Sequence, residues 1–306
     1  MAIHQINGRP AGIYPMLFAL FAEDGRLDRE AMRRQVESLV AAGVHGIAVL
    51  GLASESNKLG ADERRDMIRW AAEDLDSRLP LSVTIPGVNV ADQVELAAFA
   101  LDHGAGWLVL QPPPVTGITS ASLAEFFGDI ARRINAPIGI QIAPEYLGNS
   151  VTVATALELS REHPNVSILK VELPGYAVTE MLSAVGDGFC IFNGQDGVDL
   201  PDAIRGGCAG CIPGAECADL LVAIYEHLKL GTPEGDERAD ALYREIAPLI
   251  IFLMRSIDIF LTYGKPILCR RLGLPEHNSR PRLPSSAVTV ERSRIAAHWS
   301  RHLGPM

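Results

Sequence analysis

The stretch Val166-Ser167-Ile168-Leu169-Lys170-Val171-Glu172 is one of eight short apolar runs that recur along the chain. Runs that are apolar on both faces are typical of strands in a parallel sheet covered by helices. Between them lie segments with apolar residues at helical spacing, the clearest over residues 123–134. This alternation predicts an α/β fold, a (β/α)₈ barrel. The expected strands are residues 12–17, 46–50, 81–85, 107–110, 138–142, 166–171, 189–193 and 209–212.

The domain division follows from where this alternation stops. We expect residues 1–230 to form the barrel, because Gly231-Thr232-Pro233 then interrupts the pattern. Further helical periodicity covers roughly residues 237–263 and 287–298. We therefore expect residues 231–306 to be a helical C-terminal appendage packed on the barrel. Within the barrel, Asp28 and either Ser120 or Ser122 are the expected helix N-caps.

Composition limits the classes of function. The 306 residues are 48% hydrophobic and 21% charged, which excludes general disorder. The net charge of −10 argues against a nucleic-acid or anionic-membrane partner. No apolar run approaches the roughly 18 residues of a membrane helix, and residues 1–5 lack the features of a signal peptide. An odd number of cysteines, five, favours a reducing cytoplasm over a disulfide framework.

Active sites of (β/α)₈ barrels lie at the C-terminal ends of the strands. No histidine falls at an expected strand end, which disfavours a metal-dependent aldolase. Cys208 and Cys211 form a single Cys-x-x-Cys pair without a second pair at suitable spacing, so we expect no metal. No phosphate-binding or dinucleotide motif is present, and we expect no cofactor. The polar residues at strand ends are Ser54, Glu55, Gln141, Lys170, Glu172, Asn193 and Asp196.

Lys170 is the most informative of these residues. Side chains alternate along a strand, so Ile168, Lys170 and Glu172 face the barrel interior if Leu169 and Val171 face the helices. An apolar interior disfavours the charged amine and should lower the pKa of Lys170. A neutral amine can condense with a ketone to give a Schiff base. The alternative is a lysine that simply pairs with Glu172.

Two further segments could bind a ligand. The turn Gly51-Leu52-Ala53-Ser54-Glu55-Ser56 opens a helix, and its free backbone N–H groups with the Ser54 hydroxyl would suit a carboxylate. The alternative is an ordinary helix start at which Glu55 favours the helix dipole. Gln141 points inward between small neighbours, which leaves room for a ligand. The alternative there is a structural hydrogen bond to a neighbouring strand.

Together these motifs resemble the dihydrodipicolinate synthase/N-acetylneuraminate lyase superfamily of Schiff-base barrels. The resemblance implies that Lys170 forms the Schiff base. It also implies that the turn containing Ala53, Ser54 and Glu55 holds the carboxylate of a 2-keto acid, with Asp196 as a further substrate-binding residue. Relatives of this kind are homotetramers or dimers. The markers are Asp24-Gly25-Arg26-Leu27-Asp28, the 51–55 turn, Pro144, Lys170, Gly194-Gln195-Asp196 and Gly206-Gly207.

Departures from the family pattern bear on the substrate. The turn carries Leu52-Ala53-Ser54 where most members have paired hydroxyls. Gln141 stands where most members have a proton-relaying tyrosine, and a carboxamide cannot shuttle a proton as a phenol does. Tyr146 replaces the arginine of dihydrodipicolinate synthases, so we do not expect that activity. The combination is similar to 2-keto-3-deoxy-L-arabonate dehydratases and related sugar-acid enzymes.

The resemblance leads to a preferred hypothesis and its alternatives. We expect dehydration of a 2-keto-3-deoxy sugar acid, with Lys170 as nucleophile, Glu172 as acid and base, and Gln141 orienting a hydroxyl or water. The alternative from the same iminium is retro-aldol cleavage to pyruvate plus an aldehyde. Less favoured are dihydrodipicolinate synthesis and a non-catalytic barrel that binds a keto acid. In each case the expected partner is a small-molecule 2-keto acid.

Overall fold

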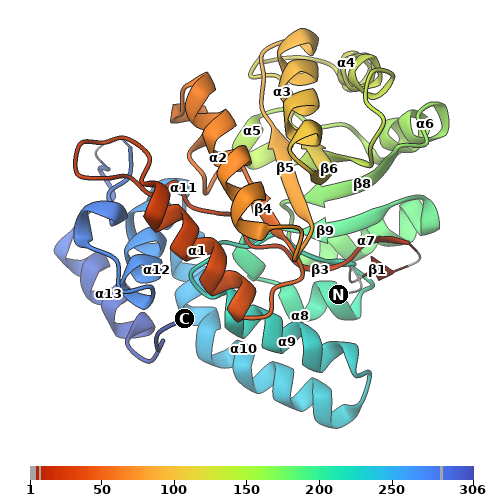
Figure 1. Ribbon diagram of the computed structural model, residues 1–306. Coiled ribbons are helices and arrows are strands. Elements are labelled where there is room, and N and C mark those ends of the chain that lie inside the picture. Colours follow the sequence, from red (N-terminus) through yellow and green to blue (C-terminus); the bar gives the residue numbers. More distant parts are fainter. Residues whose placement is uncertain (1–4, 7, 283–284) are drawn as a thin grey trace.

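The computed structural model describes residues 5–6, 8–282 and 285–306. Residues 1–4, part of the stretch in which we expect no signal peptide, lie outside this range. The chain folds as a barrel of eight parallel strands surrounded by helices (Figure 1), which confirms the expected fold. Every expected strand is present: three have the predicted bounds, four are shorter, and the strand at residues 105–110 begins two residues earlier than predicted. The strands are β3 (Gly12–Ile13), β4 (Ile47–Val49), β5 (Leu81–Ile85), β6 (Ala105–Leu110), β7 (Ile138–Ile142), β8 (Val166–Val171), β9 (Cys190–Asn193) and β10 (Gly210–Cys211).

The strands follow one another around the barrel in the order β3-β10-β9-β8-β7-β6-β5-β4. A parallel bridge between Met16 and Ala48 closes the circle, and Leu17 N–H donates to the Ala48 carbonyl at 2.9 Å. Because all strands run in one direction, their carboxyl ends meet at one rim. This topology brings together side chains that are far apart in the sequence.

The helices of the barrel confirm the alternating pattern. Asp28 caps its helix as expected, since its carboxylate accepts from the Glu30 and Ala31 N–H groups. Thr119, and not Ser120 or Ser122, caps α4, because the extended backbone at Thr119 lets its hydroxyl accept from the Ser122 N–H. The helices are α1 (Arg29–Ala41), α2 (Ala61–Leu75), α3 (Val90–Asp102), α4 (Ser120–Ala131), α5 (Pro144–Leu147), α6 (Val153–Glu162), α7 (Gly175–Val185), α8 (Leu200–Arg205) and α9 (Ala218–Lys229).

An antiparallel pair, β1 (Gln5–Ile6) with β2 (Arg9–Pro10), precedes the barrel and was not expected from the sequence. Each strand has two residues, too few to show an alternating pattern. The Cys190 thiol donates to the Pro10 carbonyl at 3.2 Å, which joins this pair to the first residue of β9. The pair therefore lies at the end of the barrel opposite the carboxyl rim.

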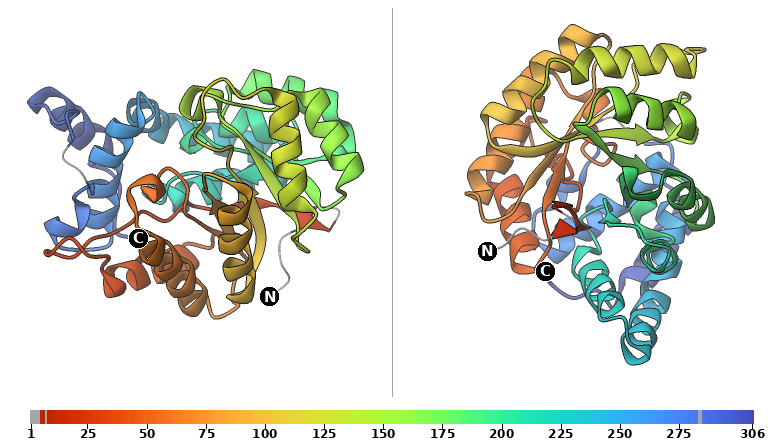
Figure 2. Two further views of the ribbon diagram at one scale, coloured as in Figure 1. Left: turned by 90° about the horizontal axis from the view of Figure 1, so that it is seen from above. Right: turned by 90° about the vertical axis from the view of Figure 1, so that its right-hand side faces the viewer.

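Helices of the C-terminal region gather on one side of the barrel (Figures 1 and 2). They are α10 (Pro233–Leu253), α11 (Ile257–Ile259), a π-helical turn η4 (Phe260–Gly264), α12 (Lys265–Arg271) and α13 (Val290–Ser300). The boundary expected at residue 230 remains a prediction. No single helix among the described residues is long and apolar enough to cross a membrane; α10 with 257–271 would qualify only as a pair bent by 110°.

The continuous helix expected over residues 237–263 is wrong, because the chain breaks after Leu253. Ser256 has extended backbone, and its hydroxyl accepts from the Ile259 N–H at 3.1 Å, so it caps a new helix. Apolar spacing continues through the break, and for this reason the periodicity did not reveal it. The break turns α11 and η4 back toward the carboxyl rim of the barrel.

Aromatic side chains fill the interior of the barrel. Tyr14, Trp107 and Phe192 come from three non-neighbouring parts of the sheet yet contact one another, with ring centroids 5.2 to 5.6 Å apart. Only side chains that point inward can meet in this way. Phe192 is paired in register with Lys170, and Lys170 with Gln141. Lys170 and Gln141 therefore share the interior face, as the strand alternation predicts.

Candidate active site

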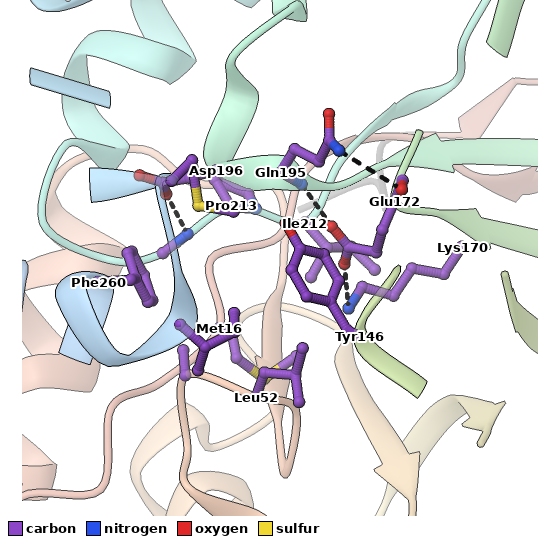
Figure 3. A pocket seen from close by; sticks show the side chains of 14 residues that line it. Met16, Leu52, Tyr146, Lys170, Glu172, Gln195, Asp196, Ile212, Pro213 and Phe260 are labelled. Carbon is purple, nitrogen blue, oxygen red and sulfur yellow. Dashed lines mark hydrogen bonds and ion pairs between the residues drawn. The ribbon is translucent and has the colours of Figure 1, made fainter. Parts of the chain in front are cut away.

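A pocket opens at the carboxyl rim above the aromatic interior (Figure 3). Its empty space, including the open mouth, is about 400 Å³. Apolar side chains form most of the wall, and a few polar groups converge within it. The lining residues are Met16, Leu52, Ala53, Tyr146, Lys170, Glu172, Gln195, Asp196, Ile212, Pro213, Gly214, Met254, Ile257 and Phe260.

Lys170 and Glu172 form an ion pair at the base of this pocket. Lys170 Nζ lies 2.9 Å from Glu172 Oε1, and the two side chains are 4% and 8% exposed. Glu172 Oε2 accepts from the Gln195 N–H at 2.5 Å, so both carboxylate oxygens are held (Figure 3). The pairing considered above as the alternative for Lys170 is thus present, and a cavity adjoins it.

The turn after β9 is shaped around Glu172. A Cβ atom on Gly194 would lie 2.1 Å from Glu172 Oε2, so only glycine leaves room for the carboxylate. Gln195 and Asp196 then adopt left-handed backbone, with φ of 49° and 54°. Such a conformation costs about 1–3 kcal/mol for a residue other than glycine and is concentrated at functional sites. Here the strained turn η3 (Gln195–Gly197) directs one N–H to Glu172 and places Asp196 in the pocket wall.

The paired geometry allows a proton transfer within the site. At 2.9 Å, the Lys170 ammonium can pass a proton directly to Glu172 Oε1. That transfer produces a neutral amine and a neutral carboxylic acid side by side. The first is a nucleophile toward a carbonyl carbon, and the second can protonate the oxygen that the carbonyl loses. An ion pair beside a cavity is therefore compatible with Schiff-base chemistry.

Gln141 lies next to Lys170 but behind the pocket surface. Its Oε1 accepts from Gln111 Nε2 at 2.9 Å, which is the structural bond to a neighbouring strand considered above. Its Nε2 is buried and has no hydrogen-bond partner among the described residues. A buried N–H without a partner is costly, and a polar ligand or water beside Lys170 would satisfy it. The orienting role of Gln141 stays a prediction.

The turn that follows β4 contributes Leu52 and Ala53 to the pocket. The Ser54 side chain points elsewhere, because its hydroxyl donates to the Leu17 carbonyl at 2.6 Å and accepts from the Leu50 N–H at 3.0 Å. Ser54 is fully buried and is not a lining residue. Ala53, and not Ser54, is therefore the residue whose position suits contact with a ligand. Substrate binding by this turn remains a prediction.

Glu55 is occupied by protein partners. Its Oε1 lies 2.5 Å from Lys265 Nζ, and its Oε2 accepts from Lys58 Nζ at 3.1 Å and from the Arg282 N–H at 2.9 Å. Glu55 has left-handed backbone, with φ of 52°, and precedes the short turn η1 (Ser56–Lys58) without capping it. The structure thus separates Glu55 from the pocket and gives it an anchoring position.

Tyr146 enters the pocket from α5, although the sequence analysis treated it only as a departure from a pattern. Burial raises the pKa of Tyr146 to about 12, and the negative charges of Glu172 and Glu145 act in the same direction. Its phenol therefore stays protonated at neutral pH and can donate a hydrogen bond to a ligand. The sequence could have indicated this position, because Tyr146 lies only four residues after the carboxyl end of β7.

Met254, Ile257 and Phe260 cover the pocket from the C-terminal helices. Strand-end reasoning could not find them, since they belong to a region without strands. Phe260 stacks on Phe18 with 5.3 Å between ring centroids, which fixes this apolar wall to the first part of the barrel. Water is thereby excluded from one side of the polar cluster.

Metal-binding groups are not gathered here. Within the part of the chain that the structure describes, no three His, Cys, Asp or Glu side chains lie in an arrangement for holding a metal. Cys208 and Cys211 are buried free thiols, and burial raises the pKa of both.

Comparison with known proteins places this geometry in context. A model described as the dihydrodipicolinate synthetase family matches residues 9–295. The Escherichia coli K12 protein YagE, provisionally named a 2-dehydro-3-deoxy-D-gluconate aldolase, is 30% identical over 159 residues, about half of either chain (52% of this one, 53% of YagE). E. coli YjhH, provisionally named a 2-dehydro-3-deoxy-D-pentonate aldolase, is 26% identical over 226 residues (72% and 75%). The 4-hydroxy-tetrahydrodipicolinate synthase of Salinibacter ruber is 29% identical over 225 residues (71% and 74%).

A solved structure agrees in fold. The crystal structure of YagE in complex with pyruvate superposes with a TM-score of 0.83 at 22% identity, covering 95% of this chain and 98% of YagE. At this identity the similarity shows the fold alone.

Proposed function

The chain belongs to the dihydrodipicolinate synthetase family, and we propose that it is a Schiff-base lyase that dehydrates a 2-keto-3-deoxy sugar acid. The observation that carries this proposal is the buried pair of Lys170 and Glu172, 2.9 Å apart in the wall of a pocket. The pair combines a nucleophile with an acid and base, and no other lysine lines this pocket among the described residues.

The first step is formation of the iminium. Glu172 takes a proton from Lys170, and the neutral amine attacks C2 of the keto acid. Glu172 returns that proton to the C2 oxygen, a second proton moves to this oxygen from the attacking nitrogen, and the oxygen leaves as water. The backbone of the turn at Ala53 is our candidate for holding the substrate carboxylate, because this turn lies in the pocket wall.

The second step removes the C4 hydroxyl. The iminium draws electrons from C3, so Glu172 as a carboxylate can remove a C3 proton. The C4 hydroxyl then leaves as water with the proton that Glu172 took from C3, and a C3–C4 double bond forms. Hydrolysis of the iminium frees Lys170 and releases a product whose carbon chain is intact. Gln141 stands beside Lys170 with an unpartnered Nε2, and we assign it the orientation of a hydroxyl or water.

A second candidate is retro-aldol cleavage, favoured by the provisional names of YagE and YjhH. It starts from the same iminium but needs a base for the C4 hydroxyl proton. The Tyr146 phenol could receive that proton only as phenolate, and its pKa of about 12 disfavours this form at neutral pH. We therefore place dehydration first.

Product analysis separates the two reactions. The purified chain is incubated with 2-keto-3-deoxypentonate, and the products are identified by mass spectrometry. Dehydration gives a product lighter by one water with all carbons retained, which we expect. Release of pyruvate would assign the cleavage instead, and an unchanged substrate would contradict both.

Two accompanying proposals concern the protein's surroundings. The buried free cysteines support a reducing cytoplasm as its location. Membership of the family supports a homo-oligomer, a tetramer or dimer, which size-exclusion chromatography with light scattering would test.

A further inference from the structure

At the edge of the pocket, Asp196 meets a second buried acid, Glu216, which the sequence analysis did not select. Asp196 is 5% exposed, and Glu216, between β10 and α9, is fully buried. Asp196 Oδ1 accepts from the Gly214 N–H at 2.7 Å. A Cβ on Gly214 would lie 2.4 Å from Glu216 Oε2 and 3.0 Å from Asp196 Oδ1, so both carboxyl groups adjoin the same residue.

Most oxygens of this pair lack a donor. Asp196 Oδ2 and both Glu216 carboxyl oxygens have no hydrogen-bond partner among the described residues. Arg271 is nearby, but its Nη1 donates to the Glu216 main-chain carbonyl and its guanidinium pairs with Asp219 at 2.6 Å. Two buried carboxylates cannot both stay ionised at such close range. Burial and the Glu216 charge raise the pKa of Asp196 well above its ordinary range, so the pair retains a proton.

The Asp196–Glu216 pair adjoins the pocket that holds the reacting amine of Lys170. Lys170 and Asp196 line one pocket, and the wall beside Asp196 includes Pro213 and Phe260 (Figure 3). A keto acid bound through C2 to Lys170 would extend its far end along this wall. A hydroxyl there would meet Asp196, the member of the pair that lines the pocket. A carboxylate there would meet one retained negative charge and, among the described residues of the pocket wall, no cation other than Lys170.

We propose that Asp196 and Glu216 share one proton and together bind the hydroxyl group at the far end of the substrate, so that they select chains ending in a hydroxyl over chains ending in a carboxylate. The inference rests on the proposed function and adds the determinant of its substrate class. Glu216 acts here as a specificity residue that accepts the shared proton and holds Asp196 in place.

Three probes that differ only at C5 test this directly: 2-keto-3-deoxypentonate ends in a hydroxymethyl group, 4-hydroxy-2-ketopentanoate in a methyl group, and 4-hydroxy-2-ketoglutarate in a carboxylate. Borohydride trapping of each on Lys170 gives the concentration for half-maximal labelling, with or without turnover. We expect the hydroxymethyl probe to label at concentrations lower by about 100-fold or more than the other two, because an unpaired buried acceptor penalises analogues without the hydroxyl. Equal labelling of all three would overturn the proposal.

The variant Glu216→Gln keeps the shape and removes the charge. We expect the ratio of the half-maximal labelling concentrations of the carboxylate and hydroxymethyl probes to fall by about tenfold or more, with labelling by pyruvate, which lacks the far end, as the internal reference. Glu291→Gln, the same chemical change at an exposed residue outside the pocket, is the matched control and should keep the wild-type ratio. If Glu216→Gln shifts all probes and pyruvate by one common factor, its role is structural and the proposal fails. If the wild type does not trap pyruvate at all, the proposed function itself fails, which is a distinct result.

Discussion

Lys265 and Glu55, which are 210 residues apart in the sequence, form an ion pair in which Nζ and Oε1 are 2.5 Å apart and neither side chain is exposed. The pair joins α12 to the turn that follows β4, and this turn supplies Ala53 to the pocket. The C-terminal helices therefore hold part of the candidate site as well as covering it.

Breaking this pair should destabilise the protein strongly. Lys265→Met leaves Glu55 buried without its closest cation, and removing one partner of a buried pair costs about 3–5 kcal/mol. Urea unfolding would measure the loss. Glu291→Gln, which breaks an exposed pair with Arg294, is the control and should leave the free energy of unfolding nearly unchanged. Equal losses in the two variants would show that the Lys265–Glu55 pair is not an anchor.

Glu172→Gln should separate binding from turnover. The amide keeps the shape but cannot move protons, so kcat should fall by about 10²–10⁴-fold. Imine formation on Lys170 should survive over a long incubation, because the variant keeps the nucleophile and slows only the proton transfers. Steady-state rates and borohydride trapping would be measured on the same preparation. Full turnover in this variant would mean that Glu172 has been given the wrong role.

Tyr146→Phe should affect binding more than the chemical step. The phenol stays protonated at neutral pH, as its pKa of about 12 requires, and so acts as a hydrogen-bond donor. Losing one such bond corresponds to roughly 0.5–1.5 kcal/mol, or up to about tenfold in KM. The measurement is KM and kcat across pH 6–9. A large fall in kcat with a changed pH profile would instead assign Tyr146 to proton transfer and would favour the retro-aldol reaction.

The Asp196–Glu216 pair should make stability depend on pH. The folded state raises the pKa of Asp196 above its ordinary value of 3.8, through burial, Glu216 and Glu172, so it retains a proton that the unfolded chain has lost. This contribution to stability is fully present below the ordinary value and is lost as the pH rises through the folded value. Glu216→Gln should flatten that dependence. Urea unfolding at several pH values would measure the free energy of unfolding of both proteins. The same pH dependence in wild type and variant would contradict the prediction.

The sequence predicts the barrel well because its signal is local and repeated. Each buried strand is an apolar run, and each intervening helix carries its own period, so the eight strands of the barrel could be located one by one. The break at Ser256 could not be predicted from the sequence, because apolar spacing continues across it and a single capping hydroxyl starts the new helix. The strands of the β1–β2 pair are too short to show any pattern.

The candidate site also has residues that the sequence predicts and residues that it does not. Lys170, Glu172 and Asp196 follow from the rule that polar residues at strand ends face the pocket. Their partners depend on tertiary contacts that no local pattern encodes. Glu216 lies in the chain after β10 and not at a strand end, and Lys265 begins α12, outside the strands of the barrel. In hindsight, a lysine among buried residues such as Ile267 and Leu268 indicates a buried anion elsewhere.

The central claim is that Lys170 forms a covalent imine with a 2-keto acid, and peptide mapping after borohydride reduction with pyruvate tests it most directly. The chain has four lysines, Lys58, Lys170, Lys229 and Lys265, so the site of labelling is unambiguous. The account predicts the mass gain of one reduced pyruvate on the peptide that carries Lys170, and none in a Lys170→Met variant. Labelling of Lys265 or Lys58 instead, or no labelling at saturating pyruvate, would contradict it.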